Sequence, residues 1–454
     1  MTTQFIIDSV DAHQEEITDL AKKIWENPEP GWKETQAVCW TAEVLEQNGF
    51  RVEQGAYRMP TAIRAVWGSG HPVVGFCAEY DCLPGLSQEA CPFPNPVVPG
   101  GFGHGCGHNL LGAGCVGAAI ALKEALEKEN AAGTVILYGC PAEELESGKG
   151  WMAKAGAFSE CDYTLAWHPA GENRDSYGEH MSIEEAVFQF RGTSSHAASA
   201  PHLGRSALDA VQLMNIGSEF LREHVTDDVR IHYQITNGGG AANVVPDFAE
   251  VSYMIRAITR EGVINAFRRV QKCAEGAALM TDTAVSVIRK GGYYPTLQNH
   301  VIGEAVQEAR AEIPLEEYTE EELAFADRIN RFYPEYQEGI TPPISIENQE
   351  LLHSPIFQST DYGDVQHICP GFQVRECCAP TLFRQHSWSM TAAAGSAIGF
   401  KGMIRAAKLM AAAAYKLVSD PARLQAAKAE FAKSMGGKVY ESPLSADLPW
   451  PYGK

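Results

Sequence analysis

The sequence contains no long hydrophobic run. No uninterrupted apolar stretch approaches about 18 residues, the length that a membrane-spanning helix needs, so we expect no transmembrane segment. Residues 1–16 also lack a basic stretch followed by an apolar one, which argues against a secretory signal. We therefore expect a cytoplasmic protein.

Basic residues are few. Lys and Arg number 36 against 57 Asp and Glu, so the formal net charge is −21, and no long basic run offsets this excess. Such a chain is a poor partner for nucleic acid or an anionic membrane. If the substrate is an anion, the positive charge that holds it must be local.

Internal repeats and low-complexity tracts are absent as well. The hydrophobic content of 45% and the mixture of charges indicate a globular protein. The 454 residues are enough for about two to three domains with a sizeable core. A chain of this size needs no disulfide framework, so we interpret the 12 cysteines as thiols. Most lie in apolar surroundings, as core residues do, and Cys106 is the exception.

Short apolar runs alternate with helical patterns and predict an α/β fold with a mostly parallel sheet. One helix is expected to end at Asn27-Pro28, and a second around Glu34–Asn48. Residues 184–297 have the order β-α-β-β-α-β, typical of a small ferredoxin-like domain. Strand and helix signals of the first kind resume near ISIENQE, after an acidic segment that predicts a surface helix. We therefore predict a first domain of residues 1–183 and 298–454, interrupted by a second of residues 184–297.

The segment GHGCGHN, residues 103–109, concentrates groups that can bind a metal. His104, Cys106 and His108 are separated by single glycines, which permit tight turns and let side chains converge on one ion. Thiolate and imidazole suit zinc and related divalent metals. Taken alone, the motif could equally be a buried structural thiol beside two hydrogen-bonding histidines.

Other polar residues follow predicted strands. Glu143 and Glu144 come directly after the strand TVILYGC, where open α/β sheets usually place their sites. His168 follows a further apolar strand, and His386 lies in a polar island, FRQHSWSM. Each could have a bland role: a solvated acidic turn for the pair of glutamates, or a structural role for a lone histidine.

Together these residues suggest a dinuclear metal site. The predicted ligands are thiolate, imidazole and carboxylate groups, namely Cys106, His108, Glu144, His168 and His386. Five ligands exceed the need of a closed four-coordinate structural zinc and suit two metals that share a ligand. Glu143 is then left as a carboxylate that can take a proton from water.

The sequence resembles the M20 metallopeptidase and amidohydrolase family, in the subgroup that replaces an aspartate ligand with cysteine. The resemblance spans nearly the whole chain and is carried by AEYDCLPG at 78–85, GHGCGHN at 103–109, CPAEE at 140–144, WHPA at 167–170, SSHAASAPHLGRSALDA at 194–210, GGGAANVVPD at 238–247 and RQHSW at 384–388. It implies a catalytic domain interrupted by a lid and dimerisation domain, and two divalent ions per subunit, manganese or zinc.

The resemblance also implies roles for single residues. Glu143 matches the family's general base, and Cys106 is the expected bridge between the two metals. His196 matches a histidine that reaches the active site of the other subunit of a homodimer and stabilises the oxyanion. Asn243 matches a residue that binds substrate or the oxyanion, and Arg256 matches an arginine that binds the free carboxylate of the substrate. We expect outer positions for His104 and for Asp81, which in other branches orients a ligand histidine.

We therefore expect a hydrolase that cleaves the amide between an acyl group and an amino acid. The segments EYDCLPGLSQ, GHNLLG, STDYGDV and HSW are similar to those of the branch that acts on p-aminobenzoyl-glutamate, which suggests a second homologous subunit as well. Alternatives are the same chemistry on another N-acyl amino acid, such as indole-3-acetyl-aspartate, or on a short dipeptide. A catalytically silent metal-binding dimer and a hydrolase with Cys106 as nucleophile are more distant hypotheses.

Overall fold

The computed structural model describes residues 2–452 and contains a six-stranded sheet with the order β1-β2-β4-β3-β5-β12. The strands β4, β3, β5 and β12 pair in parallel, whereas β1 and β2 are antiparallel, so the sheet is mostly parallel as predicted. The carboxyl ends of the parallel strands therefore meet at one edge. The bounds are β1 Arg51–Gln54, β2 Ile63–Ser69, β3 Val73–Glu79, β4 Gly133–Cys140, β5 Tyr163–Ala170 and β12 Gly371–Cys377.

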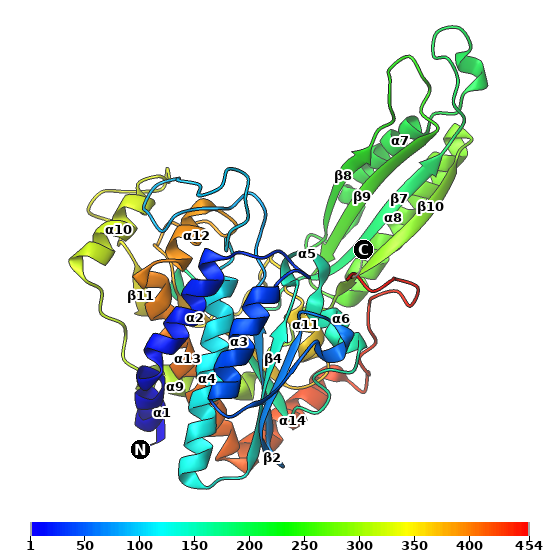
Figure 1. Ribbon diagram of the computed structural model, residues 1–454. Helices are drawn as coiled ribbons and strands as arrows, with labels where there is room; N and C mark the ends of the chain where they lie inside the picture. The colour runs from blue at the N-terminus through cyan, green and yellow to red at the C-terminus, as the bar shows by residue number, and fades with distance from the viewer. Residues whose placement is uncertain (1, 453–454) are drawn as a thin grey trace.

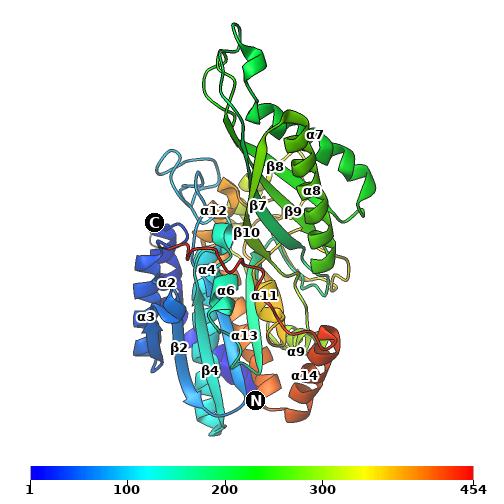
Figure 2. The same ribbon diagram turned by 90° about the vertical axis from the view of Figure 1, so that its right-hand side faces the viewer.

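Helices cover both faces of this sheet (Figures 1 and 2). The larger core lies under α4 and α13, which pack on each other, and α1 and α2 pack on α4. A second core on the opposite face includes residues of α6, α11 and the C-terminal segment. The bounds are α1 Thr2–Ala12, α2 Gln14–Glu26, α3 Thr35–Gln47, α4 His108–Glu129, α6 Gly148–Lys154, α9 His300–Glu312, α11 Tyr362–Gln366, α13 Ala397–Val418 and α14 Pro421–Met435.

The first helical stretch differs from the prediction of one continuous helix. The chain turns at His13 and forms α1 and α2, and each of them lays an apolar face on α4. By length and composition, α4 is the one helix within residues 2–452 that could cross a membrane. Its apolar window is 89% buried inside the protein, as expected for the core helix of a globular domain.

A second, four-stranded antiparallel sheet projects from the first (Figure 1). Its order is β10-β7-β9-β8, and the helices α7 and α8 pack on it around a separate core. The chain order β7-α7-β8-β9-α8-β10 confirms the predicted β-α-β-β-α-β pattern. The bounds are β7 Ser182–Arg191, α7 Ala207–Leu221, β8 Arg230–Asn237, β9 Phe248–Ala257, α8 Arg260–Thr281 and β10 Ala284–Tyr293.

After β10 the chain forms helices and a short strand before it returns to the first sheet at β12. The helix α9 begins at His300, and the segment ISIENQE forms β11, which pairs with the short β6 outside the main sheet. The acidic segment forms α10, whose start is fixed by a capping box between Thr319 and Glu322. The remaining bounds are α5 Glu143–Glu146, β6 Glu172–Asn173, α10 Glu320–Asn330, β11 Ser345–Asn348, α12 Trp388–Ala394 and the short turns η1 Ala56–Arg58, η2 Pro201–Leu203 and η3 Arg222–His224.

Candidate active site

Sharp local backbone turns bring the predicted ligands to the carboxyl edge of the main sheet. Gly107 has φ +82°, and a Cβ there would lie 2.6 Å from the methyl carbon of Met390, so a residue without a side chain is needed between Cys106 and α4. Ala142 and His386 also have positive φ, 52° and 54°. Such strained residues are typical of functional sites.

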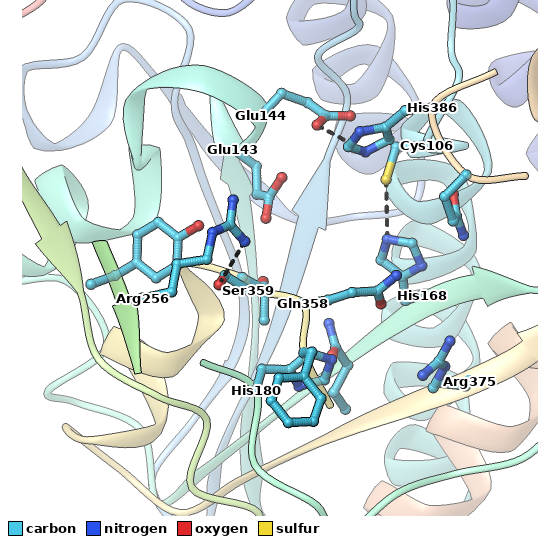
Figure 3. A pocket seen from close by; sticks show the side chains of 15 residues that line it. Cys106, Glu143, Glu144, His168, His180, Arg256, Gln358, Ser359, Arg375 and His386 are labelled. Carbon is cyan, nitrogen blue, oxygen red and sulfur yellow. Dashed lines mark hydrogen bonds and ion pairs between the residues drawn. The ribbon is translucent and has the colours of Figure 1, made fainter. Parts of the chain in front are cut away.

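The five predicted ligands gather into two groups that share one residue. Cys106, His108 and His168 form the first group, and Cys106, Glu144 and His386 form the second, with ligand atoms within 4.8 Å of one another in each. The Sγ of Cys106 lies 3.2 Å from Nε2 of His168, and Nε2 of His386 lies 3.4 Å from a carboxylate oxygen of Glu144 (Figure 3). The thiol of Cys106 therefore belongs to both groups of potential ligand atoms.

Hydrogen bonds orient both imidazoles of the first group, the buried His108 and the half-buried His168. Nδ1 of His168 donates to the carbonyl oxygen of Pro169 at 2.8 Å, which leaves Nε2 as the lone-pair nitrogen facing Cys106. Nδ1 of His108 lies 2.8 Å from a carboxylate oxygen of Asp81, whose other oxygen accepts from the backbone N–H of Glu144 at 3.0 Å. Such carboxylate and carbonyl partners are the usual supports of metal-binding histidines. The sequence left the role of Asp81 open, and the structure places it against two predicted ligands.

The donor set fits a cation. Nε2 of His108 and Oε1 of Glu144 are buried without a hydrogen-bond partner, although a Glu79 oxygen lies 3.1 Å from the former. Burial raises the pKa of Glu144 to about 7 despite the nearby His108. Burial and the neighbouring carboxylates of Glu79 and Asp361 likewise raise the pKa of Glu143, although Lys149 opposes them. Buried carboxylates around ligand atoms that have no hydrogen-bond partner form an environment that a divalent ion neutralises.

A buried lysine that the sequence analysis missed lies beside this cluster. Nζ of Lys149, in α6, contacts a carboxylate oxygen of Glu79 and lies 2.6 Å from one of Asp361. All three side chains are at most 3% exposed. Because Glu79 also contacts His108, the lysine connects α6 to the predicted metal ligands.

Replacing Lys149 with methionine is expected to destabilise the protein, because it leaves two buried carboxylates without a cation. The free energy of unfolding should fall by about 3–5 kcal/mol, the usual cost of breaking a buried ion pair. Urea unfolding measures it, with Lys22→Met as the matched control, since that side chain is 59% exposed and 3.9 Å from Glu26. A loss below about 1 kcal/mol would show that the ion pairs of Lys149 with Glu79 and Asp361 do not stabilise the fold.

The predicted substrate residue Arg256 reaches the same site from β9. It lines a cavity of about 350 Å³ together with Cys106, Glu143 and Glu144, and one guanidinium nitrogen lies 3.1 Å from Oγ of Ser359. The cavity also contains residues that the sequence analysis did not identify, namely His180, Tyr293, Phe357, Gln358 and Arg375. They come from segments far apart in the sequence, and only Arg375, one of two adjacent charges in the strand sequence FQVREC, carried a signal.

Three predicted outer or lid residues lie elsewhere. His104 is buried with Nε2 at 3.1 Å from the carbonyl oxygen of Ile24, so it faces α2 rather than the cavity. His196 and Asn243 are exposed neighbours in the projecting sheet region, joined by a backbone hydrogen bond from Ala197 to Asn243 at 3.0 Å. Neither lines this cavity.

Comparisons with known proteins agree with this geometry. The model of peptidase family M20/M25/M40 matches residues 75–355. The chain is 37% identical to one of the subunits of p-aminobenzoyl-glutamate hydrolase from Escherichia coli (strain K12), over 98% of both chains. It is 28% identical to the Xaa-Arg dipeptidase of Mus musculus, over 93% of this chain and 90% of that one.

Solved structures share the fold. A dinuclear metal-binding M20 peptidase from Bacillus subtilis matches with TM-score 0.61 and 18% identity, over 90% of this chain and 99% of that one. An aminobenzoyl-glutamate utilization protein from Klebsiella pneumoniae matches with TM-score 0.56 and 17% identity, over 88% of this chain and 97% of that one. The family match and the nearly full-length identity lead to one conclusion: the chain belongs to peptidase family M20/M25/M40, whose members here are hydrolases of amide bonds.

Proposed function

We propose that the protein is a metal-dependent amidohydrolase that cleaves p-aminobenzoyl-glutamate into p-aminobenzoate and glutamate. The observation that carries this proposal is that two potential metal-binding groups share Cys106. Members of both groups line the same cavity as Glu143 and Arg256. The 37% identity to a chain of a p-aminobenzoyl-glutamate hydrolase supports this substrate. Function in the cytoplasm is part of the same proposal.

Two divalent ions, manganese or zinc, are the proposed cofactors. Cys106, His108 and His168 would hold one, and Cys106, Glu144 and His386 the other. When bound, such ions supply Lewis acidity and lower the pKa of water. Asp81 keeps His108 in the tautomer that presents Nε2 to the site.

The remaining chemistry is assigned to side chains of the chain. Glu143 takes a proton from the attacking water and delivers it to the nitrogen of the leaving amino acid. Its position in the cavity, with a side chain 13% exposed, lets it meet water while staying largely desolvated. Arg256 binds the carboxylate next to the scissile amide, because a guanidinium matches a carboxylate in geometry and charge.

The oxyanion is assigned to His196 of a second copy, with Asn243 beside it. Both residues are exposed and do not line the cavity of the same chain, which supports assigning them to the site of a second copy. Residues 184–297 would then be the lid and dimerisation domain. Its edge strand β8 is almost entirely exposed and offers unpaired backbone groups to a partner. A second, homologous subunit is a further proposed partner, since the Escherichia coli relative is named as one subunit of its enzyme.

Mixing two inactive variants tests the shared site. Glu143→Gln and His196→Ala are each expected to be inactive, whereas a mixed dimer contains one site with both residues intact. After subunit exchange at equal concentration, activity should recover to about a quarter of wild type, since half of the dimers are mixed and each has one working site. Recovery below a few per cent despite exchange, measured by mass spectrometry of labelled subunits, would contradict the contribution in trans.

The substrate is tested by p-aminobenzoate release from p-aminobenzoyl-glutamate, with chelator and with manganese or zinc added back. Release that requires metal and is lost in Glu143→Gln supports the proposal. Cleavage of indole-3-acetyl-aspartate, hippurate or dipeptides alone keeps the chemistry and rejects the substrate. A fully metallated protein that cleaves none of these amides, alone or with its homologous subunit, contradicts the proposed function.

A further inference from the structure

One arginine in the cavity has no role in the proposal above. Arg375 lies in the middle of β12, between residues that are buried, and its Cα is the register partner of His168 on the neighbouring parallel strand β5. Register partners in a sheet lie side by side and their side chains share a face. The guanidinium therefore stands next to a predicted metal ligand and lines the cavity (Figure 3).

The guanidinium of Arg375 is free of protein partners. Within residues 2–452 its side chain makes no hydrogen bond and no ion pair, whereas its backbone N–H donates to Asp175 at 2.7 Å. The carboxylates around it are already engaged: Arg310 holds both oxygens of Asp175, and Arg174 lies 3.5 Å from Glu172. Desolvation accordingly lowers the pKa of Arg375 from its usual value, although the group stays charged.

A second guanidinium stands on a different side of the same cavity. Arg256 comes from β9 of the projecting sheet, and Figure 3 shows it beside Ser359, across the cavity from Arg375. Glu143 and Glu144 lie on the α5 side, where the amide is to be cleaved. Two half-buried arginines on opposite sides of one cavity, in a protein of net charge −21, match a ligand that has two separate negative charges.

We propose that Arg375 is a specificity-determining residue that binds the side-chain carboxylate of an acidic leaving amino acid, while Arg256 binds its main-chain carboxylate. This inference rests on the proposed amidohydrolase function. A dicarboxylic amino acid satisfies both guanidinium groups, whereas a neutral one leaves Arg375 desolvated and unpaired. The cavity therefore selects N-acyl glutamate or aspartate over N-acyl amino acids with neutral side chains.

Paired substrates separate the two arginines. p-Aminobenzoyl-glutamate and p-aminobenzoyl-glutamine have nearly the same shape and differ in the side-chain charge. Wild type should cleave the glutamate compound with a kcat/KM about 30- to 300-fold higher, as expected for a charge-assisted bidentate pair. In Arg375→Met this ratio should fall to about 1–5, mainly because the glutamate compound loses kcat/KM through a higher KM. In Arg256→Met both compounds should lose activity by similar factors and the ratio should persist.

Controls make the result unambiguous. Arg375→Lys keeps the charge without the bidentate fork and should retain part of the preference, and Arg174→Met, at a neighbouring arginine outside the cavity, should retain all of it. If Arg375→Met does not fold, the wild type alone decides: a glutamate-to-glutamine ratio below about 3, or equal product inhibition by free glutamate and glutamine, overturns the inference. Failure of every amide would instead overturn the function itself, and a ratio unchanged in Arg375→Met would overturn only the role of this residue.

Discussion

Replacing Glu143 with glutamine is expected to lower kcat by about 10³- to 10⁴-fold, at the upper end of what a general base contributes. The amide keeps the shape and hydrogen-bonding reach of the side chain but cannot accept a proton from water. Glu143 is outside both groups that share Cys106 but lies with Glu79 and His108 in a third group of potential ligand atoms. Because we assign it as the base and not as a ligand, the variant should retain its full metal content and fold. Steady-state kinetics on p-aminobenzoyl-glutamate, together with metal analysis of the same preparation, measure both effects.

A matched control separates loss of the base from loss of a negative charge. Glu347 lies exposed on β11, away from the cavity, and Glu347→Gln should keep wild-type kinetics. Glu143 lies 3.9 Å from Nε2 of His108, so its negative charge also acts on a predicted metal ligand. The metal content of Glu143→Gln is therefore measured together with its activity. If Glu143→Gln loses metal as well as activity, the residue acts as a ligand and the assignment as a base is wrong.

Sequence alone could indicate which site residues lie together where these residues are close along the chain. Cys106 and His108 are separated by one residue, and Glu143 and Glu144 directly follow a strand, so a single loop places each pair at the carboxyl edge of the sheet. The alternating strand and helix patterns predicted both sheets for the same reason. The break at His13 was missed because it depends on how two short helices share the surface of α4, which no local pattern records.

Partnerships between distant segments could not be read in the same way. Lys149 meets Asp361 across 212 positions, and Asp81 meets His108 only because β3 and α4 are neighbours in space. The position of His196 relative to the cavity also needs the structure: the resemblance implied a role in the active site of another subunit, and His196 does not line the cavity of this chain. Arg375 is the exception, since two adjacent charges, Arg375 and Glu376, within the strand sequence FQVREC are themselves a signal.

Removing Cys106 is expected to cost the protein both metals, whereas removing a histidine from one group should cost one. Cys106 belongs to both ligand groups, His168 only to the first and His386 only to the second. Cys106→Ala should therefore bind close to zero ions per chain after dialysis, and His168→Ala and His386→Ala about one each, against about two for wild type. Mass spectrometry of the metals measures the stoichiometry, and all three variants should lose amide hydrolysis.

The variant Cys106→Asp is a second test of whether residue 106 serves both metals. A carboxylate can bridge two cations but is a harder ligand than a thiolate, so this variant should regain about two ions while shifting its preference from zinc towards manganese. The same variant excludes the nucleophile hypothesis, because hydrolysis that survives in Cys106→Asp does not pass through sulfur. One ion retained in Cys106→Ala would show that the thiol serves a single metal. If that ion stays with His108, Glu79, with a carboxylate oxygen 3.1 Å from Nε2 of His108, is a candidate for the replacing ligand.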